Sequence, residues 1–198
     1  WVVQDGGSSD TTAEVAKHSG VTLNWECSAD KGIYDALNQA IQRCSGDWIL
    51  VLQAGDWLAG PNALQSLFAS VDASQHDILI ACFNELSIDG TLHQRRPSNP
   101  TGKLADLKSG QFQAPGPHWL SGMPCHQAIL ILRSWCQRFP FDLTLRISAD
   151  WLQMFETIDA GARVGMSSTV LSWYPNGGYS FDHSQVWIEN VIEIAKRF

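Results

Sequence analysis

The sequence has no apolar run long enough to cross a membrane. Its longest runs, residues 48–52 and 128–132, have the length of strands, whereas a membrane-spanning helix needs about 20 apolar residues. Basic residues are also scarce, because 13 Lys and Arg stand against 20 Asp and Glu, for a formal net charge of −7. A chain this acidic does not offer the basic surface typical of nucleic-acid binders. We therefore expect no nucleic-acid partner and no general attraction to anionic lipid.

The cysteines form no pattern typical of a disulfide framework or a zinc site. There are five, an odd number, and none lies in a C-x-x-C pair, the spacing that marks many structural zinc sites. We therefore expect buried free thiols in a reducing cytoplasm. With 198 residues, of which 44% are hydrophobic and 17% charged, the chain has the composition of one globular domain.

Short apolar strands alternate with amphipathic helices in the first half of the chain. The predicted strands are residues 1–4, 21–25 and 48–52, and the predicted helices are 11–18, 32–44 and 62–71. This alternation is typical of an α/β domain with a largely parallel, doubly wound sheet. Ligands bind such sheets beyond the carboxyl ends of the strands. That rule selects three turns, at residues 5–10, 26–30 and 53–56, all rich in small or acidic residues.

The second half of the chain is less regular. Its predicted elements are strands at 77–86, 91–94 and 128–132, an extended segment at 163–174, and helices at 149–159 and 182–198. Asp89-Gly90 predicts a hairpin turn, and Ser148 is the expected cap of the helix 149–159. Residues 95–117 hold four prolines and three glycines. We expect a long loop there, of the kind that often serves as a lid or binding loop.

Two of the selected turns carry carboxylates suited to a nucleotide. Asp5 ends the first strand, where it can accept hydrogen bonds from a base N–H or a ribose hydroxyl. A plain turn, with Asp10 capping the next helix, explains the same residues equally well. Asp30 precedes the helix 32–44, whose free N–H groups favour a diphosphate, and Lys31 adds positive charge. A capped helix with solvated polar residues is the alternative.

Two further carboxylates are suited to metal binding and proton transfer. Asp56 follows the buried strand 48–52, where it can hold a divalent cation that bridges phosphate oxygens. The alternative is a turn aspartate. Asp150 lies in the first turn of the helix 149–159, where the helix dipole favours an ionised carboxylate that can act as a general base. An aspartate that only stabilises the helix start is the alternative.

In order and spacing, these segments resemble the family 2 glycosyltransferases. The matching segments are residues 2–12, 30–38, 46–56, 125–128, 148–151 and 177–180. The resemblance covers nearly the whole chain, and the subgroup to which it is most similar is the bacterial exopolysaccharide and colanic-acid, WcaE-like type. It implies an α/β fold of the GT-A type, with a mostly parallel sheet flanked by helices. It also implies one domain over 1–198, with a nucleotide-sugar-binding half (1–86) and an acceptor and catalytic-base half (87–198).

The resemblance also implies roles for single residues. Asp5 would contact the nucleobase, and Asp30 would line the nucleotide pocket with Asn38 supporting it from the helix. Asp56 would bind the divalent cation, Mn²⁺ or Mg²⁺, and Asp150 would be the catalytic base.

Four more residues are implied to lie around the acceptor. His126 and Gln127 would lie on the acceptor side, with Gly177 and Gly178 in a loop beside the site. The implied reaction is an inverting transfer of sugar from a UDP- or GDP-linked donor to a glycan or lipid-linked oligosaccharide. That places the chain in bacterial surface polysaccharide biosynthesis, in the cytoplasm, with peripheral association at the inner face of the membrane.

Two features depart from the family pattern. The family's metal motif usually carries further acidic residues, whereas Gln53, Ala54 and Gly55 precede Asp56 here, so we expect metal affinity to rest on fewer charges. The family's first strand and its following helix have no counterpart ahead of Trp1. We therefore expect that a segment is cut away or disordered there, that the sheet is short of a central strand, and that donor binding is weakened.

Two rival hypotheses belong to other functional classes. A nucleotide- or glycan-binding relative without turnover fits the thinned metal motif. A sugar-phosphate nucleotidyltransferase also has α/β architecture, but it needs a Gly-rich phosphate loop with basic residues near its start, and the sequence shows none.

Overall fold

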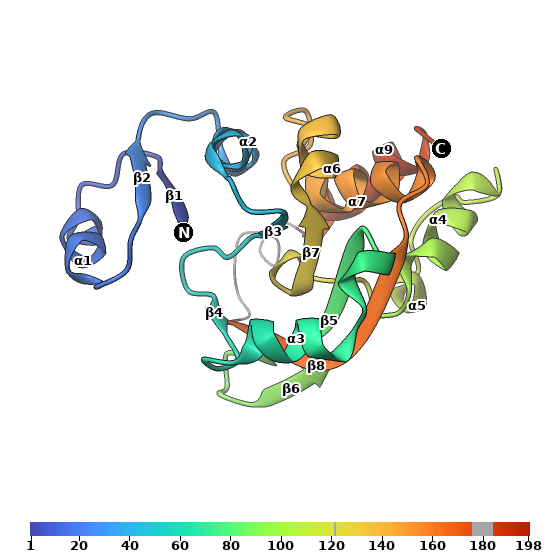
Figure 1. Cartoon of the computed structure of the whole chain (residues 1–198). Helices are drawn as coiled ribbons and strands as arrows, with labels where there is room; N and C mark the ends of the chain where they lie inside the picture. The colour runs from blue at the N-terminus through green and yellow to red at the C-terminus, as the bar shows by residue number, and fades with distance from the viewer. Residues whose placement is uncertain (121, 176–183) are drawn as a thin grey trace.

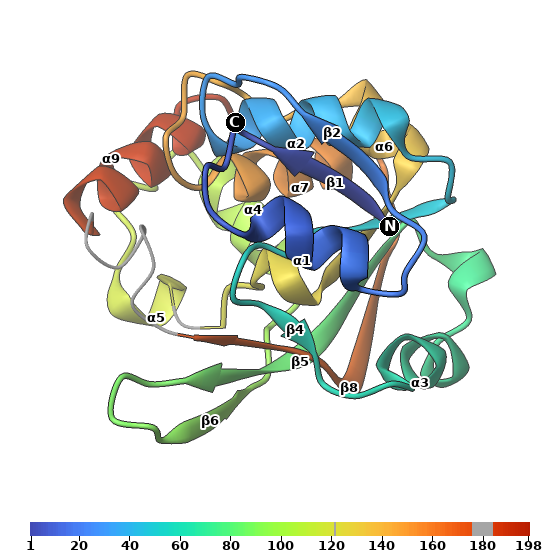
Figure 2. The same ribbon diagram turned by 90° about the vertical axis from the view of Figure 1, so that its left-hand side faces the viewer.

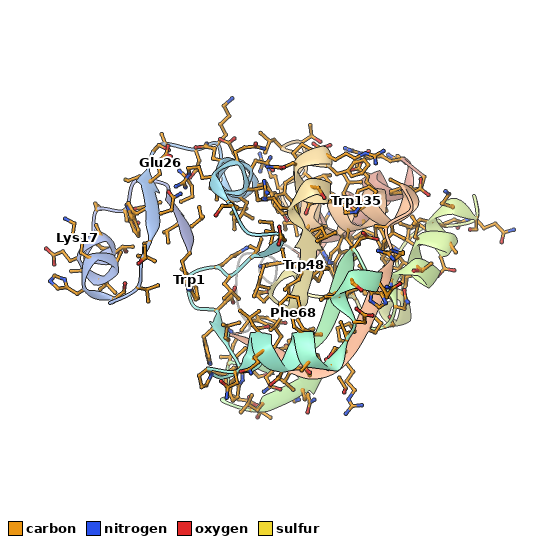
Figure 3. All side chains as sticks on the ribbon, in the orientation of Figure 1. Trp1, Lys17, Glu26, Trp48, Phe68 and Trp135 are labelled. Carbon is orange, nitrogen blue, oxygen red and sulfur yellow. The ribbon has the colours of Figure 1, made fainter. Side chains whose placement is uncertain are left out.

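A computed structural model describes residues 1–120, 122–175 and 184–198 of the chain. The N-terminal unit consists of the strand β1 (Val2–Asp5), the helix α1 (Thr12–His18) and the strand β2 (Asn24–Cys27). The two strands pair in parallel, with Val2 opposite Asn24. Figure 1 shows this unit to one side of the molecule, with α2 (Ile33–Arg43) between it and the remaining helices. Lys17 extends from the outer side of α1 (Figure 3).

The body of the molecule is built on a six-stranded mixed sheet. Its strands are β3 (Trp48–Leu50), β4 (Trp57–Leu58), β5 (Ile78–Leu86), β6 (Leu92–Arg95), β7 (Ile129–Leu132) and β8 (Val164–Pro175). Their order is β3-β7-β5-β8-β4, and β6 pairs with β5 as a hairpin. Only the β5–β8 pair of this sheet is parallel among the described residues.

The prediction of a mostly parallel sheet is therefore wrong, because most strand pairs of this sheet are antiparallel. The α/β class is as predicted. Apolar runs show that a strand is buried, but they do not show its direction. β7 enters between β3 and β5 and runs antiparallel to both, and the turn at Asp89-Gly90 folds β6 back on β5. The predicted halves 1–86 and 87–198 thus share one sheet, because β5 pairs with three strands of the second half.

Helices cover both faces of this sheet, and each face has its own apolar core. The helices on the larger core are α2, α4 (Pro100–Lys108), α5 (Pro117–Leu120), α6 (Arg133–Arg138), α7 (Ala149–Asp159) and α9 (Ser184–Ala195). The smaller core lies under α3 (Ala63–Ser70), on the other side of the sheet (Figure 2). Along β5, Ile78 and Ile80 enter the larger core while Leu79 and Ala81 enter the smaller one, as the period of two in a strand requires.

The edge of the sheet at β3 packs against α3. The rings of Trp48 on β3 and Phe68 on α3, both labelled in Figure 3, have centroids 6.0 Å apart and meet edge to face. All five cysteines are free thiols, as predicted, but only Cys82 and Cys136 are buried; Cys44 and Cys125 are partly exposed and Cys27 is exposed. Within the described residues, no helix is both long and apolar enough to cross a membrane.

The predicted long loop at 95–117 is wrong, because residues 100–108 form the helix α4. Pro100 occupies its first turn, where a missing N–H costs nothing. The Asn99 side chain accepts a hydrogen bond from the Thr101 amide at 2.9 Å, which is an ordinary N-cap. Proline and asparagine there indicate a helix start as strongly as they indicate a loop. The helix predicted from residue 182 is described from Ser184 onward, and residues 182 and 183 lie outside the described part.

Candidate active site

Asp150 stands in the first turn of α7, with one polar side chain near each carboxylate oxygen. The Tyr34 hydroxyl lies 3.4 Å from Oδ1, and His126 Nδ1 lies 3.5 Å from Oδ2. Tyr34 comes from α2 and His126 from the short 3₁₀ turn η2 (His126–Ala128) before β7. The Asp150 side chain is 16% exposed, so it is held by its neighbours and still open to solvent.

The start of α7 has an unusual conformation. Ser148 has φ of 66° and ψ of 14°, in the left-handed region, and its side chain makes no cap hydrogen bond. Ser148 is thus at the cap position, but the predicted side-chain cap is wrong, because this conformation leaves its buried hydroxyl without a partner. The Ala149 amide instead donates to the Tyr34 hydroxyl at 3.2 Å. Burial, and after it the charge of Asp150, raises the pKa of Tyr34.

An apolar recess opens beside Asp150. Its walls include Ile49 of β3, Ile129 and Ile131 of β7 and Phe141, and its polar lining includes Asp150 and His126. His126 Nε2 is buried, with no hydrogen-bond partner in the part of the chain that the structure describes. The His126 imidazole therefore lies between the recess and the Asp150 carboxylate, and its Nδ1 faces that carboxylate.

Asp56 closes the turn after β3. Its Oδ2 accepts a hydrogen bond from the Gln53 amide at 2.8 Å, and Gly55 takes φ of 95°, a conformation that favours glycine. Asp56 is therefore held within its own turn. The pKa of the Cys125 thiol is raised, first by burial and then by the charges of Asp150 and Asp56.

The two turns of the N-terminal unit meet each other. Asp5 Oδ1 accepts hydrogen bonds from the amides of Gly7 at 3.1 Å and Ser8 at 2.8 Å. Asp30 Oδ1 accepts one from the Gly32 amide, and its Oδ2 would lie 2.6 Å from any Cβ at Gly6. A side chain at position 6 would displace the Asp30 carboxylate. The Asp30 carboxylate thus lies against the turn that follows Asp5.

Asn38 has a different setting. Its Nδ2 donates to the Phe141 carbonyl and its Oδ1 accepts from the Phe141 amide, both at 2.9 Å. The side chain ties α2 to the segment before α7, so any support that it gives to the nucleotide pocket is indirect. Gln127 is 6% exposed and accepts a hydrogen bond from the Cys125 thiol. Gly177 and Gly178 lie outside the described residues.

One helix connects the two parts of the site. Asp30 lies three residues before the start of α2, and Tyr34 in the first turn of α2 reaches Asp150. Tyr34 and Cys125 were not predicted as site residues, although both lie inside segments that carry the family resemblance. Trp151, which follows Asp150, is 8% exposed and packs in the larger core, so its role is core packing.

The residues for a divalent cation are few. Among the described residues, no three His, Cys, Asp or Glu side chains form a group that could hold a metal ion. Asp56 offers one carboxylate, with Oδ1 not engaged by any described hydrogen bond. Mg²⁺ is commonly held by one or two carboxylates together with substrate phosphates. The donor set therefore fits a cation shared with a diphosphate, and it does not fit a cage made by protein alone.

The fold is also that of known enzymes. A crystal structure of S. aureus TarS 1-349 in complex with UDP-GlcNAc superimposes with a TM-score of 0.63, over 98% of this chain and 56% of that crystallised chain, at 15% sequence identity. At that identity the likeness shows the fold alone, and it confirms the expected GT-A type.

Sequence relatives agree with the fold. PGL/p-HBAD biosynthesis glycosyltransferases of Mycobacterium bovis and Mycobacterium tuberculosis are 28% identical over 155 residues, which are 76% of this chain and 54% of those proteins. This chain thus spans about half the length of these curated relatives. An uncharacterized glycosyltransferase of Mycobacterium tuberculosis is 39% identical over 66 residues, 32% of this chain and 24% of its own length. The model of glycosyl transferase family 2 matches residues 1–138, and the chain therefore belongs to that family.

Proposed function

We propose that this chain carries the donor site and the catalytic base of an inverting glycosyltransferase. The observation that carries the proposal is the setting of Asp150, a carboxylate held at a helix start by Tyr34 and His126 in a member of glycosyl transferase family 2. A fixed, partly open carboxylate is suited to take a proton from an alcohol. The sugar would pass from a nucleotide-diphospho-sugar to a glycan or lipid-linked acceptor.

The reaction would be a single displacement. Asp150 accepts the proton of an acceptor hydroxyl as its oxygen forms a bond to the anomeric carbon. The bond from that carbon to the diphosphate oxygen breaks, and the nucleoside diphosphate leaves with the electron pair. Asp5, and Asp30 which lies against the neighbouring Gly6, would hold the base and ribose of the nucleotide. Asp5 and Asp30 would thus bind the donor, whereas Asp150 would accept the proton.

Asp56 would hold Mn²⁺ or Mg²⁺ jointly with the donor diphosphate. When bound, the cation supplies positive charge against the charge that develops on the leaving group. Since Gln53, Ala54 and Gly55 add no carboxylate, the affinity for the cation would depend strongly on the diphosphate. We expect cation and nucleotide to bind together.

The relatives guide the choice of substrates and setting. TarS was crystallised with UDP-GlcNAc, which favours a UDP-linked donor here over a GDP-linked one. The mycobacterial relatives carry the name of a PGL/p-HBAD biosynthesis pathway. We propose a role in bacterial surface glycan assembly, of the exopolysaccharide or colanic-acid, WcaE-like type, in the cytoplasm at the inner face of the membrane.

One observation favours a second candidate function. Asp56 stands alone, and the described residues hold no group of three metal-binding side chains. A relative that binds nucleotide or glycan without turnover would look the same. The sugar-phosphate nucleotidyltransferase hypothesis has no such support, because the family match covers the N-terminal 138 residues.

The test is calorimetric titration of UDP and GDP, each with and without Mn²⁺, into the protein and into Asp56→Ala. We expect UDP binding that depends on Mn²⁺ and is lost in Asp56→Ala. The matched control is Asp89→Ala, because Asp89 also closes a turn by accepting a backbone hydrogen bond, from Thr91 at 2.9 Å. If both variants bind nucleotide as the unmodified protein does, Asp56 is a turn aspartate only. If neither nucleotide binds the folded, full-length protein, the donor site as drawn is wrong.

A further inference from the structure

We propose that Tyr34 is a positioning residue, which caps α7 from the neighbouring helix α2 and thereby fixes the carboxylate of Asp150. The inference rests on the proposed role of Asp150 as the base. Tyr34 would act through Asp150 and not by contact with the substrate. Three features of the helix start carry it: the missing local cap, the left-handed Ser148, and the two-sided contact of the Tyr34 hydroxyl.

The first feature is the missing local cap. The first N–H groups of a helix have no partner within it and are usually satisfied by the side chain at the N-cap. Ser148 holds that position but gives no such hydrogen bond. The Tyr34 hydroxyl caps the helix instead, because it accepts a hydrogen bond from the Ala149 amide at 3.2 Å. The two residues are 115 positions apart in the sequence. A long-range cap fixes the helix start relative to α2, which a local cap cannot do.

The second feature is backbone strain. Ser148 is the only non-glycine residue with positive φ among the described residues. Such conformations are unfavourable for residues with a side chain and persist only where the surroundings impose them. Here they turn the chain sharply into α7, so that the Ala149 amide points at Tyr34 and Asp150 follows it. The strain is consistent with a helix start that is shaped for the carboxylate.

The third feature is the chemistry of the hydroxyl. A tyrosine hydroxyl has one proton to give and lone pairs to accept with. At Tyr34 it accepts from the Ala149 amide and directs its proton to Asp150 Oδ1, 3.4 Å away. Burial keeps this hydroxyl protonated, because it raises the pKa of Tyr34. The ring is held against Phe141, with centroids 5.4 Å apart.

Together these contacts hold the Asp150 carboxylate from two sides. Oδ1 faces the Tyr34 hydroxyl at 3.4 Å, and Oδ2 faces His126 Nδ1 at 3.5 Å. The Tyr34 hydroxyl is the group that also contacts the helix backbone, through the Ala149 amide. We therefore assign the anchoring role to Tyr34 on Oδ1.

The experiment uses Tyr34→Phe, which removes only the hydroxyl and keeps the ring on Phe141. Two quantities are measured: the hydrogen exchange of the Ala149 amide, and the rate of nucleotide release from whichever of UDP-GlcNAc, UDP-glucose and GDP-mannose the unmodified protein hydrolyses. We expect faster exchange at Ala149 and a kcat lowered roughly 10- to 100-fold with KM unchanged, since a small misplacement of a reacting group has costs of this order.

The matched control is Thr157→Val. Thr157 lies on the same helix, is fully buried, and donates its hydroxyl to the Gln153 carbonyl at 2.7 Å. This variant also loses one buried hydroxyl, so it should lose stability without a change in kcat or in Ala149 exchange. If Tyr34→Phe is too unstable to purify, the same measurements are made in a Ser148→Gly background, where glycine adopts φ of 66° without strain.

The outcomes separate this proposal from the proposed function. Unchanged Ala149 exchange in Tyr34→Phe overturns the cap, whatever the kinetics. Faster exchange with unchanged kcat overturns the positioning role and leaves a structural cap. If Asp150→Asn keeps full turnover, the base assignment fails instead, and the exchange result still decides whether Tyr34 caps α7.

Discussion

The N-terminal unit and the body of this chain are held together by different forces. In residues 1–32 Asp5 is the only buried residue, and α1 buries none. The body has two apolar cores, in which Phe155, Leu67 and Leu171 are completely buried. The body can therefore rely on the hydrophobic effect, whereas the unit that carries Asp5 and Asp30 depends on hydrogen bonds and ion pairs.

A single arginine makes several of the polar contacts that join this unit to α2. Arg43, at the end of α2, donates to the Val3 carbonyl at 3.1 Å, to Gln4 at 2.7 Å and to the Asn24 side chain at 3.0 Å. It also pairs with Glu26 at 3.2 Å. The proposed nucleotide-binding residues thus lie in the less firmly packed region, and the proposed base lies in the firmly packed one. Three experiments test this division.

Asp150→Asn should abolish chemistry while leaving both regions intact. We expect turnover to fall by about 10²- to 10⁴-fold, the usual contribution of a general base, because the amide accepts no proton at neutral pH. Nucleotide affinity should not change, since Asp5 and Asp30 are in the other region. Turnover and calorimetric UDP binding are measured on the same preparation. A parallel loss of UDP binding would contradict the division.

Arg43→Ala should loosen the N-terminal unit and spare the body. We expect the free energy of local opening over residues 1–32 to fall by about 3 kcal/mol, because several hydrogen bonds to a charged group are lost together. Hydrogen exchange read peptide by peptide measures it, and UDP affinity should fall with it. The control is Arg163→Ala, which removes a more exposed ion pair with Asp77 within the body. Equal protection loss in both regions would show that they unfold as one.

Asp5 gives the unit a dependence on pH. Hydrogen bonds from Ser8 and Gly7 lower the pKa of its carboxyl. A lowered pKa means stability that is present above the unfolded-state value of about 4 and is lost as the pH falls through the folded-state value. We expect the Ser8 amide resonance to shift only below about pH 4, and Asp5→Asn to abolish the shift. The Thr91 amide, bonded to Asp89, should titrate alike in both proteins.

The sequence predicted the long periodic elements well. The predicted helix 149–159 matches α7, and 32–44 matches α2 within a residue at each end. The predicted strand 77–86 matches β5 within one residue. In each of these the apolar spacing is regular and long enough to fix one type of element.

The remaining errors have physical reasons. Strand direction cannot be read from apolar spacing, so the antiparallel entry of β7 was not predicted. Proline is common both in loops and in the first turn of a helix, and Pro100 starts α4 in the segment predicted as a loop. The true cap of α7 comes from Tyr34, and a contact across 115 residues leaves no local pattern. Asp5 and Asp30 were both predicted to contact the nucleotide, and Asp30 does lie against Gly6, the residue after Asp5, while the roles of all five site residues stay predictions.

The helix α2 carries a contact at each end. Tyr34 in its first turn reaches Asp150, and Arg43 in its last turn holds β1 and β2. At 1.5 Å per residue these two side chains start about 14 Å apart along the axis, and they point in fixed relative directions. Insertion or deletion of one residue between them would rotate one end against the other by about 100°. The length of this helix is therefore fixed by the two contacts that it joins.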